Sequence, residues 1–594
     1  MTSMLARCRE GLSLQLPAVL ILTIVATRAP AQSVSGEAVY QAQCASCHDT
    51  AAARVPPKAD LRKVAVANIL RELESGAMQF IGSRLTGAER SAVAAYLGVA
   101  DSGAGTAFCA DRTVTMAGGG WNGWSPEPTN TRFQRAGLTV EQVSKLRLKW
   151  AWGFEGDTIV FSQPSVIGNN IFIGSNSGRV HALDAATGCT KWMFQADAGV
   201  RSAIVRDDGA LLFGDRGGVF YSLEAATGRL LWKKKVDDHP GARMTGAAVV
   251  HEGVVYIPVS SSEETLARAD GYVCCTFRGS VIAVRIQDGA QVWKSFTIAE
   301  EAKASGDHKG PSGAAIWATP TLDVKRGMLY AATGDNYSEP ATPMSDAVVA
   351  MDLKTGRIVW SRQTIPGDVF NGYCQPRDTC PGPDYDFGAS VILERTEDGR
   401  ELLLAGQKSG IVYALDPDRD GAIVWQARVG KGGVNGGVQW GMASDGKNVY
   451  AAKSDVVRRT GTTYDPTQGG GLTALRIRDG ERVWYAAPLA CPTPETVKPG
   501  CSPAQSAAVT VTPGVVWSGS LDGRLRAYAA EDGKVLWDFD TAREFDTVNR
   551  VRASGGGVDG PGPVIVGGRV FVGSGYARTG GMGGNVLLAF GPEE

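Results

Sequence analysis

ALDAATGCTKW (Ala182–Trp192) is the first complete copy of a motif that recurs along most of this chain. In each copy a hydrophobic segment runs into a turn that contains Gly, and a second segment ends on Trp. Alternating apolar residues on both sides of such a turn predict two antiparallel strands joined by a tight turn. Six further copies are SLEAATGRLLW (Ser222–Trp232), AVRIQDGAQVW (Ala283–Trp293), AMDLKTGRIVW (Ala350–Trp360), ALDPDRDGAIVW (Ala414–Trp425), ALRIRDGERVW (Ala474–Trp484) and AYAAEDGKVLW (Ala527–Trp537).

An eighth copy is divided between the two ends of the repeat region. NVLLAF (Asn585–Phe590) supplies its first strand, and LRLKW, which ends at Trp150, supplies the strand with the Trp. Successive Trp residues from Trp192 to Trp537 lie 40 to 67 residues apart, which is the length of a propeller blade. Pairing the first and last strands in one blade leaves no free sheet edge. The sequence therefore predicts a mainly β chain with an eight-bladed β-propeller.

The composition agrees with a large, turn-rich β-protein. Gly accounts for 76 of the 594 residues, nearly double its usual share of about 7%. The formal net charge is −1, so the overall charge gives no argument for binding nucleic acid.

The N-terminus reads as a secretory signal peptide. Arg7 and Arg9 precede an apolar run from Leu12 to Ala26, and Ala29-Pro30-Ala31 follows as a cleavage site. A membrane anchor is the alternative, but the apolar run is short for a bilayer span. We expect cleavage after residue 31 and a periplasmic mature protein without a stable membrane span.

Cysteine usage fits an oxidising compartment. Of the 11 cysteines, Cys8 lies in the signal, and two belong to the motif described next. The other eight form four candidate disulfides, the last of them by elimination, although spacing alone does not establish connectivity. The candidate pairs are Cys274–Cys275, Cys374–Cys380, Cys491–Cys501 and Cys109–Cys189.

Cys44-Ala45-Ser46-Cys47-His48 is a C-x-x-C-H motif, the attachment signature of a c-type haem. In such a site the two thiols add to the haem vinyl groups, and the His ligates the iron. A redox dithiol or half of a zinc site are the alternatives, but the βαβ pattern or second ligand pair that they need is missing. Cys44 and Cys47 are therefore predicted haem attachment residues, with His48 as the proximal ligand.

The residues after this motif predict a small all-α cytochrome c domain. Met78 lies on a Gly-containing loop and is the candidate sixth iron ligand. Thr86 to Glu89 form a capping box that begins a helix. Ser102 to Gly105 form a short flexible linker. The expected domains are a signal peptide (1–31), a cytochrome c domain (32–104) and the propeller (105–594).

The Trp repeat and the segment WNGWSP (Trp121–Pro126) resemble the pyrroloquinoline quinone (PQQ) dehydrogenases, over roughly residues 118–590. The haem domain in front of the propeller resembles the polyvinyl-alcohol dehydrogenases in particular. This resemblance implies PQQ, haem c and calcium as cofactors. A scaffold protein of outer-membrane assembly shares the repeat, so the functional prediction depends on the segments that depart from it.

The resemblance implies two calcium ligands. VSSSEE (Val259–Glu264) resembles a Ser-rich family segment that ends in a ligating Glu, which assigns Glu263 with Glu264 as the fallback. YAATGDNY (Tyr330–Tyr337) resembles the family's Thr-Gly-Asn and assigns Asn336. Oxygen donors of these kinds suit calcium. Two solvated loop acids are the alternative reading of the Glu pair.

The resemblance also implies the catalytic base. Asp386 lies between Tyr385 and Phe387, as the base does in the family, and Asp384 fits an Asx-turn after Pro383 better. Lys408, in GQKSGIVYALD, corresponds to the Lys that bonds the quinone oxygens, with an exposed turn Lys as the alternative.

Further residues are assigned to the PQQ pocket by the same resemblance. Trp317 corresponds to the floor on which the planar cofactor stacks, and Trp440 is expected to line the site or the core. Cys274 and Cys275 correspond to a vicinal disulfide that covers PQQ, although it precedes the calcium Glu in other members. Arg278 is a candidate partner for a PQQ carboxylate.

The predicted function is therefore a periplasmic quinohaemoprotein that oxidises secondary alcohols of polyvinyl alcohol to ketones. Electrons are expected to pass from PQQ to the haem and then to a cytochrome c or the respiratory chain. A PQQ dehydrogenase for small alcohols or aldose sugars is one alternative. A non-catalytic propeller that binds a partner and carries a relay haem is the other.

Overall fold

The computed structural model describes residues 34–593, except 50–54, 75–77, 83, 100–106, 136, 270, 307, 375–379, 459–463, 490, 492–497 and 578–579. The predicted signal peptide and the predicted linker lie outside the described residues. None of the helices in the described part of the chain has the length and hydropathy needed to cross a bilayer.

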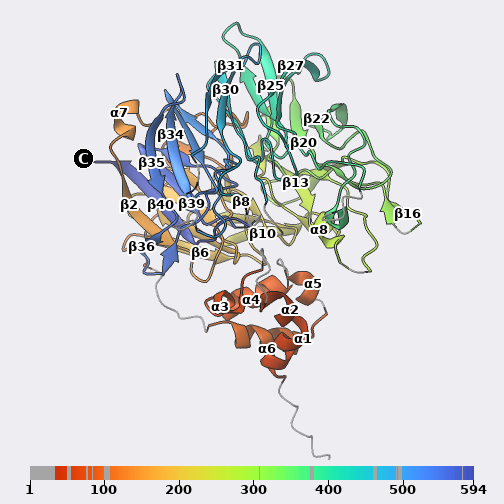
Figure 1. The fold of residues 1–594 in the computed structure, drawn as a ribbon, viewed down its shortest axis with the longest axis vertical. Helices are drawn as coiled ribbons and strands as arrows, with labels where there is room; N and C mark the ends of the chain where they lie inside the picture. Colours follow the sequence, from red (N-terminus) through yellow and green to blue (C-terminus); the bar gives the residue numbers. More distant parts are fainter. Residues whose placement is uncertain are drawn as a thin grey trace, which may run out of the picture.

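The first six helices form a small body at one end of the molecule, and the β-propeller forms the rest (Figure 1). A core that includes Tyr40, Leu73, Val93 and Leu97 holds these helices together. The predicted capping box is present, because Thr86 accepts the N–H of Glu89 and Glu89 accepts the N–H of Thr86. The helices are α1 (Gly36–Gln43), α2 (Ala45–His48), α3 (Lys58–Leu61), α4 (Val66–Glu74), α5 (Gln79–Gly82) and α6 (Gly87–Leu97).

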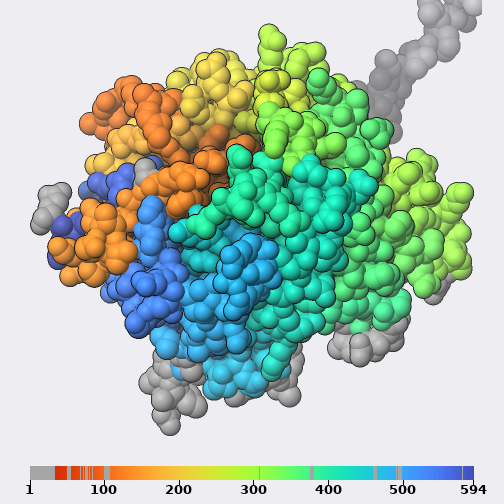
Figure 2. All heavy atoms as spheres, turned by 90° about the horizontal axis from the view of Figure 1, so that it is seen from above, coloured from red at the N-terminus to blue at the C-terminus, as the bar shows by residue number. Residues whose placement is uncertain are grey.

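Eight antiparallel sheets follow one another around a ring, and the chain colours run around it in sequence order (Figure 2). The first four blades are β3 (Ser165–Ile167), β4 (Asn170–Gly174), β5 (Arg179–Asp184) and β6 (Thr190–Gln195); β7 (Val205–Asp207), β8 (Ala210–Gly214), β9 (Val219–Glu224) and β10 (Leu230–Lys235); β12 (Val249–His251), β13 (Val254–Ser261), β14 (Ser280–Arg285) and β15 (Gln291–Phe296); β19 (Thr321–Asp323), β20 (Met328–Ala332), β22 (Ala347–Asp352) and β23 (Ile358–Gln363).

The last four blades complete the ring. They are β24 (Ile392–Arg395), β25 (Glu401–Gly406), β26 (Ile411–Asp416) and β27 (Ala422–Arg428); β28 (Ala443–Ser444), β29 (Asn448–Ala452), β30 (Leu472–Arg476) and β31 (Arg482–Ala486); β32 (Thr510–Thr512), β33 (Val515–Gly519), β34 (Arg524–Ala529) and β35 (Val535–Asp540); β38 (Val564–Val566), β39 (Arg569–Ser574), β40 (Val586–Pro592) and β2 (Leu146–Gly153).

Short elements decorate the blades. They are β1 (Gly120–Trp121), β11 (Ala242–Arg243), β16 (Lys303–Ser305), β17 (His308–Gly310), β18 (Ser312–Gly313), β21 (Asn336–Ser338), β36 (Glu544–Phe545), β37 (Ala553–Ser554), α7 (Val140–Val143), α8 (Glu263–Leu266) and the 3-10 turn Gly372–Cys374.

The eighth blade closes the ring as the divided repeat predicted. β2 pairs antiparallel with β40, with Trp150 opposite Ala589 and Leu148 opposite Phe590. Strands from the two ends of the propeller sequence are thus joined by backbone hydrogen bonds in one sheet, so the ring has no unpaired edge where it closes. The eight-bladed prediction is confirmed.

In six of the eight repeats the Trp stabilises the contact with the next blade. The indole of Trp425 donates to the carbonyl of Ile477 at 2.7 Å, and its ring lies against Gly480. A Cβ at Gly480 would lie 2.6 Å from that ring, so the repeat requires Gly at the turn. The same pairing of an indole with the next turn occurs at Trp150, Trp192, Trp232, Trp293 and Trp484.

All four candidate disulfides are confirmed. They are Cys109–Cys189, Cys274–Cys275, Cys374–Cys380 and Cys491–Cys501. Among the described residues Cys44 and Cys47 are the cysteines outside these disulfides, as the haem motif requires.

Candidate functional site: a buried acid cluster beside a central cavity

Four buried charged side chains meet between the fourth and fifth blades. The Nζ of Lys408 donates to Asp384 Oδ1 at 2.6 Å and to Asp386 Oδ2 at 2.7 Å. The other oxygen of Asp386 accepts the backbone N–H of Asp335 at 2.7 Å. One carboxylate oxygen from each of the three aspartates lies within 4.8 Å of the others. These distances are short enough for one cation to bind all three carboxylates.

The cluster carries more negative than positive charge. Burial, and then the charges of Asp386 and Glu264, raise the pKa of Asp335 well above its usual value. Burial also raises the pKa of Asp384. The charge of Lys408 acts to lower this pKa but does not outweigh burial. Burial favours the neutral amine of Lys408, but Asp384 and Asp386 outweigh it and hold its pKa well above normal. The Oδ2 of Asp335 is buried and has no hydrogen-bond partner. A cation or a proton would relieve this excess of negative charge.

An indole forms one wall of the cluster. The Nζ of Lys408 lies 5.4 Å from the ring centroid of Trp317. A Cβ at Gly388 would lie 2.0 Å from the Trp317 ring, so only Gly lets the indole approach the backbone this closely. Trp440 meets Trp317 edge to face, with ring centroids 5.2 Å apart. The two predicted Trp residues therefore lie together, and Trp317 lies directly beside the predicted base.

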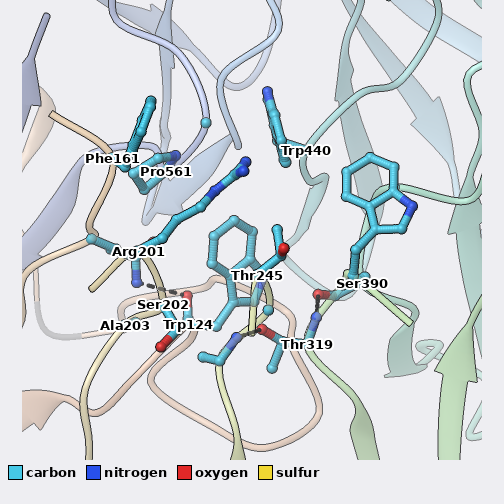
Figure 3. Close-up of a pocket in the computed structure, with 17 residues that line it drawn as sticks. Trp124, Phe161, Arg201, Ser202, Ala203, Thr245, Thr319, Ser390, Trp440 and Pro561 are labelled. Carbon is cyan, nitrogen blue, oxygen red and sulfur yellow. Dashed lines mark hydrogen bonds between the residues drawn. The ribbon is translucent and has the colours of Figure 1, made fainter. Parts of the chain in front are cut away.

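A central cavity extends from these two indoles across the ring (Figure 3). The side chain of Arg201 crosses it, between Phe161 and Trp440. Its guanidinium lies 4.7 Å from the Trp440 ring and donates to the Tyr576 hydroxyl at 3.0 Å. The sequence analysis did not select Arg201. It lies in the connection between β6 of the first blade and β7 of the second, in a segment without a family signature that would have identified it.

Glu263 is buried but occupied by protein hydrogen bonds. Its carboxylate accepts the N–H groups of Thr276 at 2.9 Å and Phe277 at 2.7 Å, and the Tyr272 hydroxyl at 2.8 Å. Burial raises the pKa of Glu263, but hydrogen bonds from His239 and Phe277 outweigh it and lower the pKa. The neighbouring Glu264 acts on the pKa of Asp335, as described above, so the fallback residue is the one whose charge reaches the cluster.

Asn336 is fully buried, and its Oδ1 accepts the Thr342 N–H at 2.7 Å. Its Nδ2 donates to the Ser312 carbonyl at 3.0 Å. Asp335, one residue earlier, enters the cluster in its place. Asp335 follows Thr333-Gly334 directly, so the family's Thr-Gly-Asn spacing, without its residue type, would have selected it.

Arg278 and the vicinal disulfide lie on the side of Glu263. The guanidinium of Arg278 donates to the Ala299 carbonyl at 2.9 Å and lies 4.2 Å from the Phe296 ring. Cys275 is fully buried and donates its N–H to the Lys309 carbonyl at 3.0 Å. The disulfide therefore directly precedes the Thr276 and Phe277 amides that hold Glu263.

The haem motif has the expected surroundings in the helical domain. His48 is buried, and its Nδ1 donates to the Pro56 carbonyl at 2.7 Å, which leaves Nε2 as the nitrogen that can bind iron. Met78 is partly buried and packs against the core cluster that contains Cys44. Two cysteines outside disulfides and an oriented imidazole are the residue set that a covalent haem needs.

Comparison with known proteins adds the family. The chain is 38% identical to a polyvinylalcohol dehydrogenase of Pseudomonas sp, over 93% of both chains. The chain belongs to the polyvinyl-alcohol dehydrogenase family. A second member, from Sphingopyxis sp. (strain 113P3), is 37% identical over 94% of this chain and 93% of its own length.

Other comparisons agree with the two-part architecture of this family member. A family model described as cytochrome C oxidase, cbb3-type, subunit III matches residues 31–97. A PQQ-repeat model described as outer membrane protein assembly factor BamB matches residues 133–381. The solved quinohemoprotein alcohol dehydrogenase of Comamonas testosteroni has the same fold, with a TM-score of 0.60 at 19% identity over 80% of this chain and 81% of that chain.

Family membership and the haem domain identify a PQQ-dependent, haem-linked alcohol dehydrogenase. The residues of the cavity and the acid cluster fit PQQ and calcium, respectively. The cavity beside Trp317 has aromatic walls and a guanidinium, which suit a planar, anionic quinone. The unpaired buried oxygen of Asp335 and the two neighbouring carboxylates suit a hard cation such as calcium.

Proposed function

We propose that this chain oxidises the secondary alcohol groups of polyvinyl alcohol to ketones in the periplasm. The names of the two most similar relatives support this substrate. The single observation that carries the chemistry is the buried Asp386, bonded to Lys408 and the Asp335 N–H beside Trp317. A pure scaffold has no need for a buried carboxylate–ammonium cluster next to an indole that lines a cavity.

Asp386 is the proposed general base. Its Oδ2 accepts a hydrogen bond from Lys408 and its Oδ1 accepts one from a backbone N–H, and both contacts fix the position of the carboxylate that takes a proton from the alcohol hydroxyl. Bound PQQ supplies the quinone that accepts the hydrogen and two electrons from the carbinol carbon. Trp317 offers the flat surface on which such a ring stacks, and Lys408 offers a positive charge that favours its reduction.

Calcium is proposed to bind within the acid cluster. The predicted ligands Glu263 and Asn336 already accept N–H hydrogen bonds in this structure. We therefore propose that Asp335 and Glu264 take these two roles, with Asp384 nearby. For the cofactor carboxylates, Arg201 lines the cavity whereas Arg278 is bonded to the Ala299 carbonyl, so Arg201 is the better-placed guanidinium. The disulfide between Cys274 and Cys275 is proposed, from the family resemblance, to cover bound PQQ.

The cellular location and the electron acceptor are proposed on separate grounds. Residues 1–31 have the pattern of a signal peptide, and four disulfides fit an oxidising compartment. Cys44, Cys47 and His48, with Met78 as sixth ligand, are proposed to hold the haem. The haem is proposed to pass its electrons to a soluble cytochrome c or to the respiratory chain.

One spectroscopic experiment tests the proposal. The purified holoprotein, loaded with PQQ and calcium, is mixed with polyvinyl alcohol while the c-type haem bands are recorded. We expect the haem to become reduced. Reduction by short alcohols or an aldose but not by the polymer would replace the substrate. A haem that stays oxidised with every alcohol, together with no dye-linked turnover, would favour the binding-protein alternative.

A further inference from the structure

The haem domain contacts the propeller through helix α4. The Nδ2 of Asn68 donates to the Gly156 carbonyl at 2.9 Å. Glu72, on the same helix, accepts a hydrogen bond from Asn176 at 3.1 Å and lies 4.0 Å from the Arg216 guanidinium. The Arg216 side chain is only 10% exposed, so this ion pair is partly shielded from solvent. The two domains are therefore joined by polar contacts of defined geometry.

This contact lies on the face of the ring that carries the acid cluster. Asn176 and Arg216 lie in the β4–β5 and β8–β9 turns, between the second and third strands of their blades. Lys408 lies in the β25–β26 turn and Asp335 in the β20–β22 connection, which are the same connection in two other blades. In a ring of equivalent blades, equivalent connections share one face.

The contact is also linked to the predicted iron ligand. The backbone N–H of Met78 donates to the carbonyl of Glu72 at 3.0 Å. The side chain of Glu72 contacts the propeller, and its backbone carbonyl accepts the Met78 N–H. The edge of the haem domain that contacts the propeller is therefore the edge that carries Met78.

A series of aromatic rings connects the contact with the acid cluster. The Arg216 guanidinium lies 5.8 Å from the Phe161 ring. Phe161 meets Tyr576 at 5.0 Å between centroids, Tyr576 meets Trp440 at 6.0 Å, and Trp440 meets Trp317 at 5.2 Å. Figure 3 shows Phe161 and Trp440 on either side of Arg201 within this series. Each ring thus touches the next, and packed atoms transmit electrons over a distance better than open solvent does.

We propose that the contact of Glu72 with Asn176 and Arg216 is the internal electron-transfer junction of this protein. Electrons reach it from the floor residue Trp317 through Trp440, Tyr576 and Phe161, and enter the haem domain beside Met78. Oxidation of one secondary alcohol to a ketone releases two electrons and two protons. The protons go to solvent. The two electrons pass one at a time through the single haem, which an external one-electron acceptor reoxidises after each transfer. The inference rests on the proposed function, because it needs alcohol oxidation at the quinone.

The test compares two readouts in the loaded holoprotein. Dye-linked turnover reports alcohol oxidation without the haem, and stopped-flow absorbance reports haem reduction. We expect Glu72→Lys and Arg216→Glu each to slow haem reduction at least tenfold while dye-linked turnover stays unchanged. The double variant Glu72→Lys/Arg216→Glu restores the ion pair in reverse, and we expect it to recover most of the rate. Asp60→Lys on α3 and Arg229→Glu in the β9–β10 turn are matched controls that should change neither readout.

A structural readout accompanies the kinetics. Small-angle X-ray scattering should show the haem domain released in the single variants and docked again in the double variant. Phe161→Leu should keep the domain docked but lower the ratio of haem reduction to dye-linked turnover. Unchanged haem reduction in a variant whose haem domain is released would overturn the proposed junction. An unchanged ratio of haem reduction to dye-linked turnover in Phe161→Leu would overturn the aromatic route. Absent dye-linked turnover in the unmodified protein would instead overturn the proposed function.

Discussion

At the scale of single residues, the hydrogen bonds of the acid cluster distinguish Asp386 from Asp384. Asp386 receives a backbone N–H from the fourth blade and the Lys408 ammonium, whereas Asp384 receives only the ammonium and has its pKa raised by burial. Asp386 is held by one more hydrogen bond than Asp384, so it is the better-positioned candidate for the base that takes the proton of the alcohol.

Replacement of Asp386 should therefore remove catalysis rather than binding. We expect Asp386→Asn to lower kcat by roughly 10²- to 10⁴-fold, the usual contribution of a general base, and to leave PQQ affinity nearly unchanged. Steady-state kinetics and equilibrium titration with PQQ measure the two quantities. Asp384→Asn is the matched control and should lose less activity. The reverse order of the two variants would transfer the base role to Asp384.

A second prediction at this scale concerns pH. Burial, with a smaller contribution from Arg179, lowers the pKa of His181 to about 3 from its usual 6.5. The folded protein thus holds a neutral imidazole, whereas the unfolded chain takes up a proton below pH 6.5. The free energy of unfolding therefore contains a contribution from His181 that is present above pH 6.5 and is lost as the pH falls toward 3. We expect His181→Leu to weaken the fall in melting temperature across this range. Identical pH profiles for the variant and the parent would contradict the assignment.

At the scale of the repeated element, the Trp indole and the turn Gly of the next blade act as a pair. The Gly480 backbone has a φ of +74°, and an added Cβ would lie 2.6 Å from the Trp425 ring. Gly327 offers a control, because its φ is +65° and a Cβ there meets nothing within 4 Å.

Gly480→Ala should cost more stability than Gly327→Ala. Both substitutions incur the left-handed backbone penalty of about 1 kcal/mol, but only the first displaces an indole from its hydrogen bond. Urea denaturation of the two variants measures the difference. Equal losses would show that the indole contact contributes little beyond backbone conformation.

At the scale of the whole molecule, ring closure depends on two segments more than 400 residues apart. β2 (Leu146–Gly153) and β40 (Val586–Pro592) build one sheet, and the Trp537 ring of the seventh blade packs on Phe590 at 5.2 Å. Loss of β40 would expose the edges of two strands and the apolar face of its neighbour.

Truncation after Asn585 should therefore prevent a cooperatively folded propeller. Near-ultraviolet circular dichroism and gel filtration should show lost tertiary signal and aggregation. Truncation after Pro592 is the control, since it removes the hydrogen bond from the Glu593 N–H to the Lys145 carbonyl and the exposed Arg147–Glu593 ion pair, each of which contributes about 0–1.5 kcal/mol. A native spectrum in the longer truncation would show that the ring does not need its closing strand.

Repeats and the haem motif were readable from the sequence because their signals are local. The Thr-Gly or Asp-Gly turn before each Trp recurs with every blade, and the divided copy at Trp150 and Asn585–Phe590 predicted the closing sheet. Cys44, Cys47 and His48 are adjacent in the chain, so spacing alone indicated their chemistry. The cysteine pairs were also predicted in full.

Only the tertiary structure decided which of the loop residues converge. Asp335 rather than Asn336 joins Asp386 and Lys408, and Arg201 rather than Arg278 lines the cavity. These residues come from loops of different blades. Neighbouring residues of one loop point in different directions, so Asp335 lies in the cluster while Asn336 is hydrogen-bonded to Thr342 and Ser312. The docking of Glu72 on Arg216 is likewise invisible in the sequence. A local pattern sets each blade, but charges that meet across blades depend on how the ring brings distant loops to one face.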